Sequence, residues 1–430
     1  MRTLPTQMAT RLSVSRTNDN ESPLRLIPHH DDDNDDDTTN NHSQQKNKKK
    51  RNKSPTITDI CPQTGVTLSR YMMELERWNP ELSEVESIFT SIQVAAKAIS
   101  NLVRKSTLQA NTGYYKGSMN IQGEEQSKMD VIANDVLKNA LNWAGHFKTI
   151  ASEEEDEPIS SSDPQGIFPE AIIDSGKSYI AVFDPLDGSA NLDSGIPVGT
   201  IFGIFRHGTE CQLDRQLCLE DVLQPGRNLV AAGYCLYSSA TTLVMTLGDG
   251  THGFTLDETI GEFVLTHPSI QIPQQGSIYS FNEGNRWEWD QPIQDYIMDI
   301  QTGMGKQQNK YKARYVGSMV ADVHRTLMYG GIFGYPADRT SLNGKLRLLY
   351  EAAPMAFLLE QAGGRASTGT RPIMDVLPTD VHARVPVILG SPDDVKELES
   401  YYEAVIEKNN KELLNAGQLN TTDAKDMHYA

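Results

Sequence analysis

The chain is poor in cysteine and contains no long hydrophobic run. Its 430 residues include only four cysteines, too few for disulfide bonds to hold a chain of this length together. No apolar stretch approaches the roughly 20 residues of a membrane-spanning helix, and the start of the chain has no apolar core of a secretory signal. We therefore expect neither a disulfide-rich secreted domain nor a membrane partner.

Positive charge is also scarce. The 39 Lys and Arg residues are outnumbered by 57 Asp and Glu, which gives a formal net charge of −18. This balance argues against nucleic acid as the main partner and is compatible with metal-dependent chemistry. The sequence also lacks a G-x-S-x-G nucleophile elbow and a G-x-x-x-x-G-K-[ST] phosphate loop, which disfavours a serine hydrolase and a P-loop enzyme.

The two ends differ in composition from the rest. Residues 1–55 combine an acidic run, 31–37, with a basic run, 46–53, and contain few residues that could pack a core, so we predict a disordered tail. The basic run is typical of a solvated segment, with a nuclear address or an interaction patch as the alternative. Residues 1–18 weakly resemble a transit peptide. Residues 411–430 are predicted to form a polar tail.

Between these tails, hydrophobic periodicity predicts alternating helices and strands. Helical spacing is found at 83–103, from about 130, and at 292–301, 319–328 and 354–361. Strands are expected at 179–183, 200–205, 229–236, 242–247, 254–266 (as a hairpin), 331–335 and 386–389. Ser83-x-x-Glu86 predicts a capping box. The stretch 270–276 predicts a boundary between an N-terminal domain, 56–268, and a C-terminal domain, 269–410.

One short stretch carries the strongest chemical signal, Phe183-Asp184-Pro185-Leu186-Asp187-Gly188-Ser189-Ala190-Asn191. Pro185 has no N–H for the ladder and is expected to end the strand 179–183. Asp184 and Asp187 would then lie at the carboxyl edge of a sheet, where α/β proteins bind ligands. Carboxylates, a carbonyl and turn N–H groups suit a Mg²⁺–phosphate complex. An ordinary Asp-Pro turn is the alternative.

Further acidic and basic residues are candidates for the same site. Acidic groups recur beside expected element ends at Glu124, Asp130, Glu153, Glu154 and Glu351, and together they suggest a polymetal site that clamps a phosphoryl group. The second half supplies phosphate-binding types, which are Asn282, Arg314, Tyr315, Tyr335, Lys345 and Arg347. A phosphorylated polyol is therefore a reasonable substrate class.

From about Val66 to Tyr402 the sequence resembles fructose-1,6-bisphosphatases. The resemblance is carried by 183–191, Leu223–Leu229, Arg314–Met319, Asn343–Glu351 and Ile388–Pro392, in one order. It implies an α/β (α+β) layered sugar-phosphatase fold, with two α/β domains and the active site between them. It also implies a homo-oligomer, most simply a homotetramer.

The resemblance assigns roles residue by residue. It implies two to three Mg²⁺ ions per subunit, with Mn²⁺ or Zn²⁺ as alternatives, on Glu153, Asp184, the Leu186 carbonyl, Asp187 and Glu351. Glu154, Asp130 and Glu124 match the catalytic carboxylates. The residues implied in substrate binding are Gly188, Ser189, Asn282, Arg314, Tyr315, Gly317, Met319, Tyr335, Lys345 and Arg347, of which Arg314 would reach a neighbouring subunit's site.

The implied activity is hydrolysis of the 1-phosphate of D-fructose 1,6-bisphosphate by metal-activated attack of water, in gluconeogenesis or the Calvin cycle. Alternatives are a sedoheptulose-1,7-bisphosphatase, a dual sugar bisphosphatase or a catalytically silent regulatory protein. A cytoplasmic location is expected, with the plastid as the alternative. Cys211 and Cys218 share one polar loop and are candidates for a redox pair, although two free thiols remain the simpler interpretation.

We predict weak or absent inhibition by AMP. Residues 82–86 read Leu-Ser-Glu-Val-Glu where AMP-inhibited relatives have Thr-Gly-Glu-Met-Thr, and Ser178 replaces a Lys of that site, although Tyr179 and Arg206 remain. The Glu86 carboxylate would occupy the N–H groups at the helix N-terminus that cradles the AMP phosphate, and its charge would repel that phosphate. An AMP titration of the bisphosphatase activity checks this, and strong inhibition at low AMP would contradict it.

Overall fold

The computed structural model describes residues 65–106, 108, 114–119, 125–160, 179–207, 219 and 221–415, with backbone only at 114–119, 125, 126, 160 and 413–415. The predicted tail 1–55, Glu124, Ser178, Cys211 and Cys218 lie outside these residues. Of the four cysteines, the described part of the chain contains Cys235, which is a buried free thiol. No helix in these ranges is long and apolar enough to cross a bilayer.

An eight-stranded sheet forms the centre of the N-terminal half. Its order is β10-β9-β8-β7-β6-β5-β3-β4, antiparallel except where β3 and β5 run parallel. The strands are β3 (Phe147–Ser152), β4 (Ile159–Ser160), β5 (Tyr179–Asp187), β6 (Val198–Arg206), β7 (Leu229–Tyr237), β8 (Thr241–Thr246), β9 (Thr251–Asp257) and β10 (Glu262–Ile270). A separate two-stranded ribbon pairs β1 (Tyr114–Met119) with β2 (Glu125–Ser127).

Helices cover both faces of this sheet. One face carries α2 (Leu68–Trp78), α3 (Ser83–Lys105) and α4 (Lys128–Ala144), and the other carries α7 (Met319–Tyr329) and α8 (Ala353–Gln361). On β5, Ile180 and Val182 pack toward α7 and α8, whereas Ala181 and Phe183 pack toward α3 and α4. Because both faces of the strand are buried, β5 reads as an unbroken apolar run.

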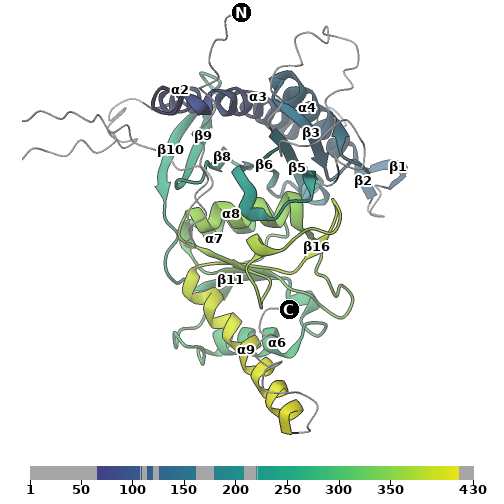
Figure 1. The fold of residues 1–430 in the computed structure, drawn as a ribbon, viewed down its shortest axis with the longest axis vertical. Coiled ribbons are helices and arrows are strands. Elements are labelled where there is room, and N and C mark those ends of the chain that lie inside the picture. Colours follow the sequence, from purple (N-terminus) through teal and green to yellow (C-terminus); the bar gives the residue numbers. More distant parts are fainter. Residues whose placement is uncertain are drawn as a thin grey trace, which may run out of the picture.

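A second sheet lies beyond α7 and α8 (Figure 1). Its order is β12-β11-β13-β17-β15, built from β11 (Ile278–Phe281), β12 (Lys312–Ala313), β13 (Ile332–Tyr335), β15 (Arg365–Ser367) and β17 (Val387–Gly390). Its outer face packs against α6 (Gln291–Thr302) and α9 (Pro392–Asn415). A short pair, β14 (Leu346–Arg347) with β16 (Arg384–Val385), flanks it. The layered α/β architecture expected from the sequence is therefore confirmed.

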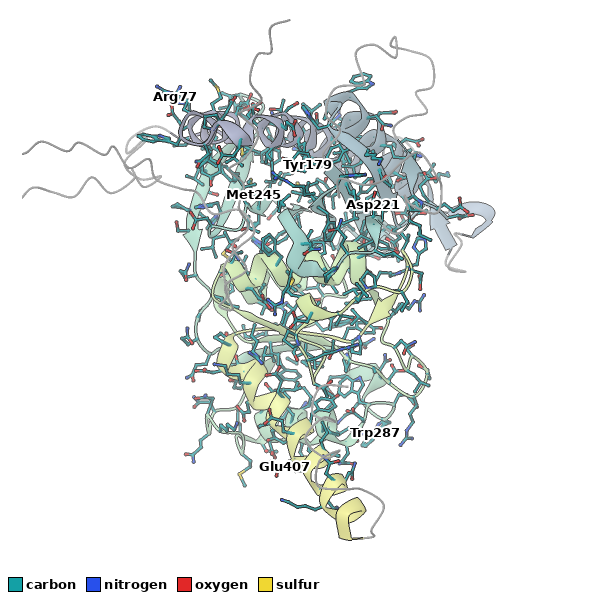
Figure 2. The ribbon with its side chains drawn as sticks, in the orientation of Figure 1. Arg77, Tyr179, Asp221, Met245, Trp287 and Glu407 are labelled. Carbon is teal, nitrogen blue, oxygen red and sulfur yellow. The ribbon has the colours of Figure 1, made fainter. Side chains whose placement is uncertain are left out.

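Apolar side chains fill the space between successive layers. Figure 2 shows Tyr179 and Met245 inside the upper half, where both are buried between the first helical layer and the large sheet. The expected helices at 83–103, near 130, and at 292–301, 319–328 and 354–361 are all present within a few residues. The expected strands are present too, including the hairpin β9–β10. Helix α9 was not anticipated and runs to Asn415, into the range expected as the polar tail.

Two local expectations are wrong. Pro185 does not end β5, which continues to Asp187 through a register shift. Ser83 does not form a capping box, because the 3₁₀ turn Pro80–Leu82 runs directly into α3 and the Ser83 N–H bonds to the Pro80 carbonyl. Glu86 instead accepts a hydrogen bond from Thr90. The AMP prediction therefore depends on the negative charges in the first turn of α3, Glu84 and Glu86.

The packing of α3 on the sheet gives a stability prediction. Phe89 is fully buried and meets Phe202 of β6 edge to face, with 5.9 Å between ring centres. Phe89→Ala should lower the free energy of unfolding by about 3–5 kcal/mol, because it leaves a cavity. The matched control is Val94→Ala on the same helix, where Val94 is 56% exposed and a change within about 0.5 kcal/mol is expected. Chemical denaturation measures both, and equal losses would contradict the prediction.

Candidate active site

A bulge in β5 places two carboxylates on the same side of the strand. Asp184 pairs with Ile201 but Asp187 pairs with Gly199, so three steps along β5 match two along β6. In a regular strand, residues three apart point to opposite faces. The extra residue removes that alternation, and a proline is tolerated at such a point because its missing N–H interrupts no ladder bond. Thr200 Oγ1 donates to the Pro185 carbonyl at 2.8 Å and fixes the bulge.

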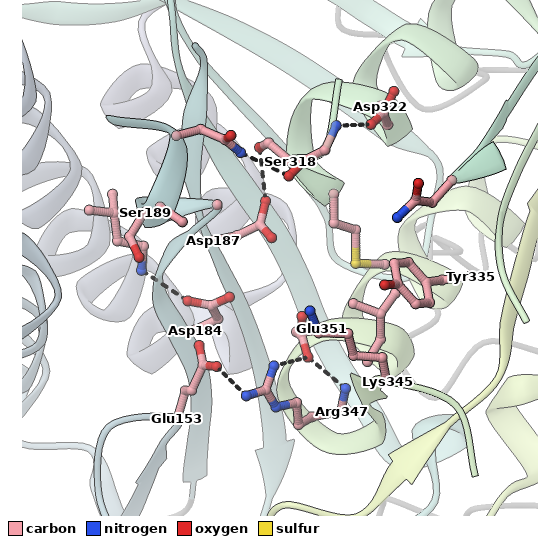
Figure 3. Close-up of a pocket in the computed structure, with 18 of the residues that line it drawn as sticks. Glu153, Asp184, Asp187, Ser189, Ser318, Asp322, Tyr335, Lys345, Arg347 and Glu351 are labelled. Atoms are coloured by element: carbon pink, nitrogen blue, oxygen red, sulfur yellow. Dashed lines mark hydrogen bonds and ion pairs between the residues drawn. The ribbon is translucent and has the colours of Figure 1, made fainter. Parts of the chain in front are cut away.

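A third carboxylate comes from the second half of the chain. Glu351 lies in the π-helical turn Leu348–Ala352 that precedes α8. One carboxylate oxygen from each of Asp184, Asp187 and Glu351 lies within 4.8 Å of the other two. Figure 3 shows these side chains converging on one cavity. This cluster therefore brings together three of the residues predicted to bind metal.

The electrostatics of the cluster favour a bound cation. Burial raises the pKa of Asp184 well above its usual value, that of Asp187 to about 6 and that of Glu351 to about 8, and repulsion between neighbouring carboxylates adds to each rise. Hydrogen bonds from Val320 N at 2.8 Å and Ser318 Oγ at 3.1 Å limit the rise at Asp187. Buried oxygen ligands with excess negative charge fit a hard divalent cation such as Mg²⁺.

Arg347 lies among these carboxylates. Its Nη2 is 3.0 Å from Glu153 Oε1, and its backbone N–H donates to Glu351 Oε2 at 2.6 Å. The guanidinium is only 5% exposed and partly offsets the charge of the cluster. Arg347 also lines the cavity, so it can hold Glu153 and Glu351 and still face a substrate, as the resemblance implies.

Asp130 and Glu154 line the same cavity. Asp130 caps α4 in a reciprocal pair with Ser127, and its Oδ2 accepts the Ser127 N–H at 2.9 Å. Its other oxygen, Oδ1, is buried and has no hydrogen bond of standard geometry among the described residues, although the Ser189 side chain lies near enough to the carboxylate to limit the rise of its pKa. Burial raises the pKa of Asp130 to about 6. A carboxylate with one fixed and one available oxygen suits proton transfer.

The opposite end of the cavity has a different chemistry. The cavity measures about 310 Å³ and continues from the carboxylates to Asn282, Tyr315, Gly317, Met319, Tyr335 and Lys345. Lys345 Nζ lies 6.0 Å from the centre of the Tyr335 ring. Arg314 is outside this lining and exposed, and its guanidinium donates to the Ala313 carbonyl. Glu124 and the two loop cysteines lie outside the described residues.

Two residues at the site were not identified as site residues from the sequence. Asp322 is fully buried in the first turn of α7, and its carboxylate accepts the N–H groups of Val316 and Gly317 and the Ser280 hydroxyl. It therefore holds the backbone beside Tyr315. Asn191, noted only as part of a motif, donates to the Gly317 carbonyl at 2.9 Å and links the two ends of the cavity. The one sequence signal for Asp322 was an acid in the first turn of a helix.

Gly188 fixes the turn after the bulge. Its φ is +76°, a conformation that favours glycine, and a Cβ there would lie 2.8 Å from Ser318 Cβ. The 3₁₀ helix Ser189–Ser194 follows, and its first internal bond runs from Asn191 N–H to the Gly188 carbonyl. The amides of Ser189 and Ala190 precede that bond at the cavity wall. They are placed to donate to an anion.

Buried carboxylates facing lysine, tyrosine and asparagine across one cavity are typical of metal-dependent enzymes that act on phosphate esters. Comparison with known proteins makes the class specific. The family model for the fructose-1-6-bisphosphatase N-terminal domain matches residues 66–268, and that for the C-terminal domain matches residues 272–403. The chain therefore belongs to the fructose-1,6-bisphosphatase family.

Similar proteins come from both plants and a protozoan. The chain is 46% identical to a chloroplastic fructose-1,6-bisphosphatase of Triticum aestivum over 78% of this chain and 81% of the relative. It is also 46% identical to a cytosolic one of Oryza sativa subsp. indica, over 79% and 96%. The holo-form crystal structure of Leishmania major fructose-1,6-bisphosphatase matches with a TM-score of 0.72 and 39% identity, over 79% of this chain and 100% of the other.

The turn at Gly188 gives a site prediction. Gly188→Ala should lower kcat by roughly tenfold to a hundredfold, because the new methyl displaces Ser318 and with it Asp187. Gly195→Ala is the matched control, since Gly195 has a φ of +69° with nothing within 4 Å of a Cβ. Each variant should lose about 1–2 kcal/mol of stability from backbone strain. Equal kcat values for the two variants would contradict the argument.

Proposed function

We propose that this chain hydrolyses the 1-phosphate of D-fructose 1,6-bisphosphate, consuming water and releasing fructose 6-phosphate and inorganic phosphate. The observation that carries the proposal is the continuity of one cavity between the carboxylate cluster and the Lys345 end. A sugar with a phosphate at each end needs both chemistries, one to cleave an ester and one to hold the other phosphate.

At the acidic end, Glu153, Asp184, Asp187, Glu351 and the Leu186 carbonyl would hold two to three divalent cations, of which Mg²⁺ is our first choice and Mn²⁺ or Zn²⁺ the alternatives. Such cations supply charge neutralisation for the phosphoryl oxygens and lower the pKa of water. Asp130 and Glu154 take the proton released by the attacking water, with Asp130 Oδ1 as the acceptor atom. The amides after Gly188 donate to the phosphoryl oxygens as negative charge develops.

At the other end, neutral donors and one cation orient the substrate. Asn282 Oδ1 accepts the Gly284 N–H at 3.2 Å. The amide oxygen is therefore occupied, and the amide N–H₂ is the group that would donate to a 6-phosphate. Tyr315 and Tyr335 would supply hydroxyl donors, and Lys345 and Met319, which line the same cavity, would contact the sugar. Arg314, exposed on the surface of a single chain, would act in the site of a neighbouring copy, as a homotetramer would allow.

Two further points concern specificity and location. Sedoheptulose 1,7-bisphosphate carries the same pair of terminal phosphates, so it is the competing substrate. A catalytically silent regulatory protein is disfavoured because the acidic cluster and its supporting hydrogen bonds are intact. The similar plant proteins are named both chloroplastic and cytosolic, so a cytoplasmic location is no better supported than a plastid one.

Release of phosphate tests the proposal directly. The protein should release phosphate from fructose 1,6-bisphosphate only with a divalent cation, with a larger kcat/KM than on sedoheptulose 1,7-bisphosphate. Asp187→Ala should lower kcat by a factor on the order of 10³, because it removes one of the carboxylates assigned to the divalent cations. Asp193→Ala is the control, since Asp193 is exposed in the following turn. Cation-independent release, or unchanged activity in Asp187→Ala, would overturn the proposal.

A further inference from the structure

A histidine outside the cavity lining connects two segments that carry acidic site residues. His382 is half-buried in the loop before β16, and its Nδ1 lies 2.8 Å from the Tyr350 hydroxyl. Its Nε2 lies 3.1 Å from the backbone carbonyl oxygen of Glu155. Tyr350 precedes Glu351 in the same π-helical turn, and Glu155 follows Glu153 and Glu154. The imidazole therefore joins the Tyr350 turn to the Glu155 backbone, which lies 227 residues before His382 in the sequence.

The donors and acceptors select one form of this imidazole. The Glu155 carbonyl can only accept, so Nε2 must carry the proton that is donated to it. In the neutral ring Nδ1 then accepts, and the Tyr350 hydroxyl is the donor. The Tyr350 ring is fully buried and packs edge to face on the imidazole, with 5.8 Å between centres. The ring is held by packing as well as by hydrogen bonds.

Glu155, whose backbone carbonyl bonds to His382, is also held through its side chain. Glu155 Oε1 accepts from Asn134 Nδ2 at 2.8 Å and pairs with Lys138, both on α4. Asn134 Oδ1 accepts from Ser152 Oγ at 2.7 Å, and Ser152 Oγ accepts the Glu154 N–H. The turn carrying Glu153 and Glu154 is thus fixed to α4 through side chains and to the second half of the chain through His382.

We propose that His382 is a positioning residue, which sets the distance between the turn bearing Glu153 and Glu154 and the turn bearing Glu351. The inference rests on the proposed function, because those carboxylates are the ones assigned to metal and water. Without the Nε2 bond the acidic turn keeps its anchor on α4 and the Glu153–Arg347 ion pair, but it loses the bond that joins the Glu155 backbone to the Tyr350 turn through His382. Groups that orient metal ligands in this way typically change affinity by about 10- to 100-fold when they are removed.

The chain contains a matched control. His324 on α7 receives the same kind of bond, with Tyr234 OH 2.7 Å from its Nδ1 and 5.8 Å between the ring centres. Neither Tyr234 nor His324 lines the cavity. Loss of either pair, Tyr234–His324 or Tyr350–His382, should therefore lower stability. Of the two pairs, Tyr350–His382 is the one that bonds to the turn bearing Glu153 and Glu154.

The test uses the full chain and Mn²⁺ as the probe, without sugar. Binding is followed by the electron paramagnetic resonance signal of free Mn²⁺, and thermal unfolding in chelator reports stability. His382→Asn, which cannot reach the Glu155 carbonyl, should weaken Mn²⁺ binding about tenfold or more. His382→Gln, whose amide nitrogen can occupy the place of Nε2, should restore binding close to that of the unchanged protein. His324→Asn should lower thermal stability without weakening Mn²⁺ binding.

Tyr350→Phe provides a second measurement if His382→Asn fails to fold. It removes the hydroxyl that fixes the ring but keeps the bond to Glu155, so Mn²⁺ binding should weaken in the same direction by less. Unchanged binding in His382→Asn, or equal weakening in His324→Asn, would overturn the inference and leave the proposed function intact. Absence of Mn²⁺ binding by the unchanged protein would overturn both.

Discussion

Burial of three carboxylates against one another is the constraint on which the rest of this structure depends. Asp184, Asp187 and Glu351 are 3%, 8% and 2% exposed, and removing an isolated carboxylate from water costs several kcal/mol even after relaxation. Such an arrangement persists only where opposite charge or hydrogen-bond donors offset it. The chain supplies Arg347 and the donors on Asp187, and a divalent cation would complete the compensation.

The layered fold makes this burial possible. The carboxylates come from β5 in the large sheet and from the turn before α8, and those elements pack together through the core between the sheets. The β5 bulge turns Asp187 to the same side as Asp184, and Gly188 allows Ser318 to approach closely enough to donate to it. Backbone geometry, rather than a flexible loop, therefore sets the positions of these carboxylates.

The sequence predicted the elements and the acidic residues better than it predicted their contacts. Apolar periodicity located α3, α7 and α8 because each buries a continuous face. The motif at the end of β5 could be recognised from its unusual composition. Rules for single residues failed where tertiary structure overrode them. Pro185 was tolerated inside a bulge, and the 3₁₀ turn before Ser83 satisfied an N–H that a capping box would otherwise have bound.

Contacts between distant segments had no local signal. Arg347 was expected among the phosphate-binding residues, and nothing in its local sequence indicated that its guanidinium would also pair with Glu153, far earlier in the chain. His382 bonds to the backbone carbonyl of Glu155, and because every residue type carries such a carbonyl, the sequence does not indicate this contact. Periodicity reports which face of an element is buried, but not which residue of another element it meets. Such pairings require coordinates.

Hydrogen bonding separates the structural carboxylates from those available for chemistry. Asp322 is as deeply buried as the cluster, but its oxygens accept two backbone N–H groups, a hydroxyl and an arginine, so its bonding capacity is used in holding the Tyr315 loop. Asp130 has one oxygen bound to Ser127 and one buried oxygen with no hydrogen bond of standard geometry among the described residues. A buried acceptor left unmatched is costly unless a ligand or water satisfies it. The cavity beside Asp130 is where such a ligand or water would lie, so hydrogen bonding distinguishes Asp130 from Asp322 where burial alone does not.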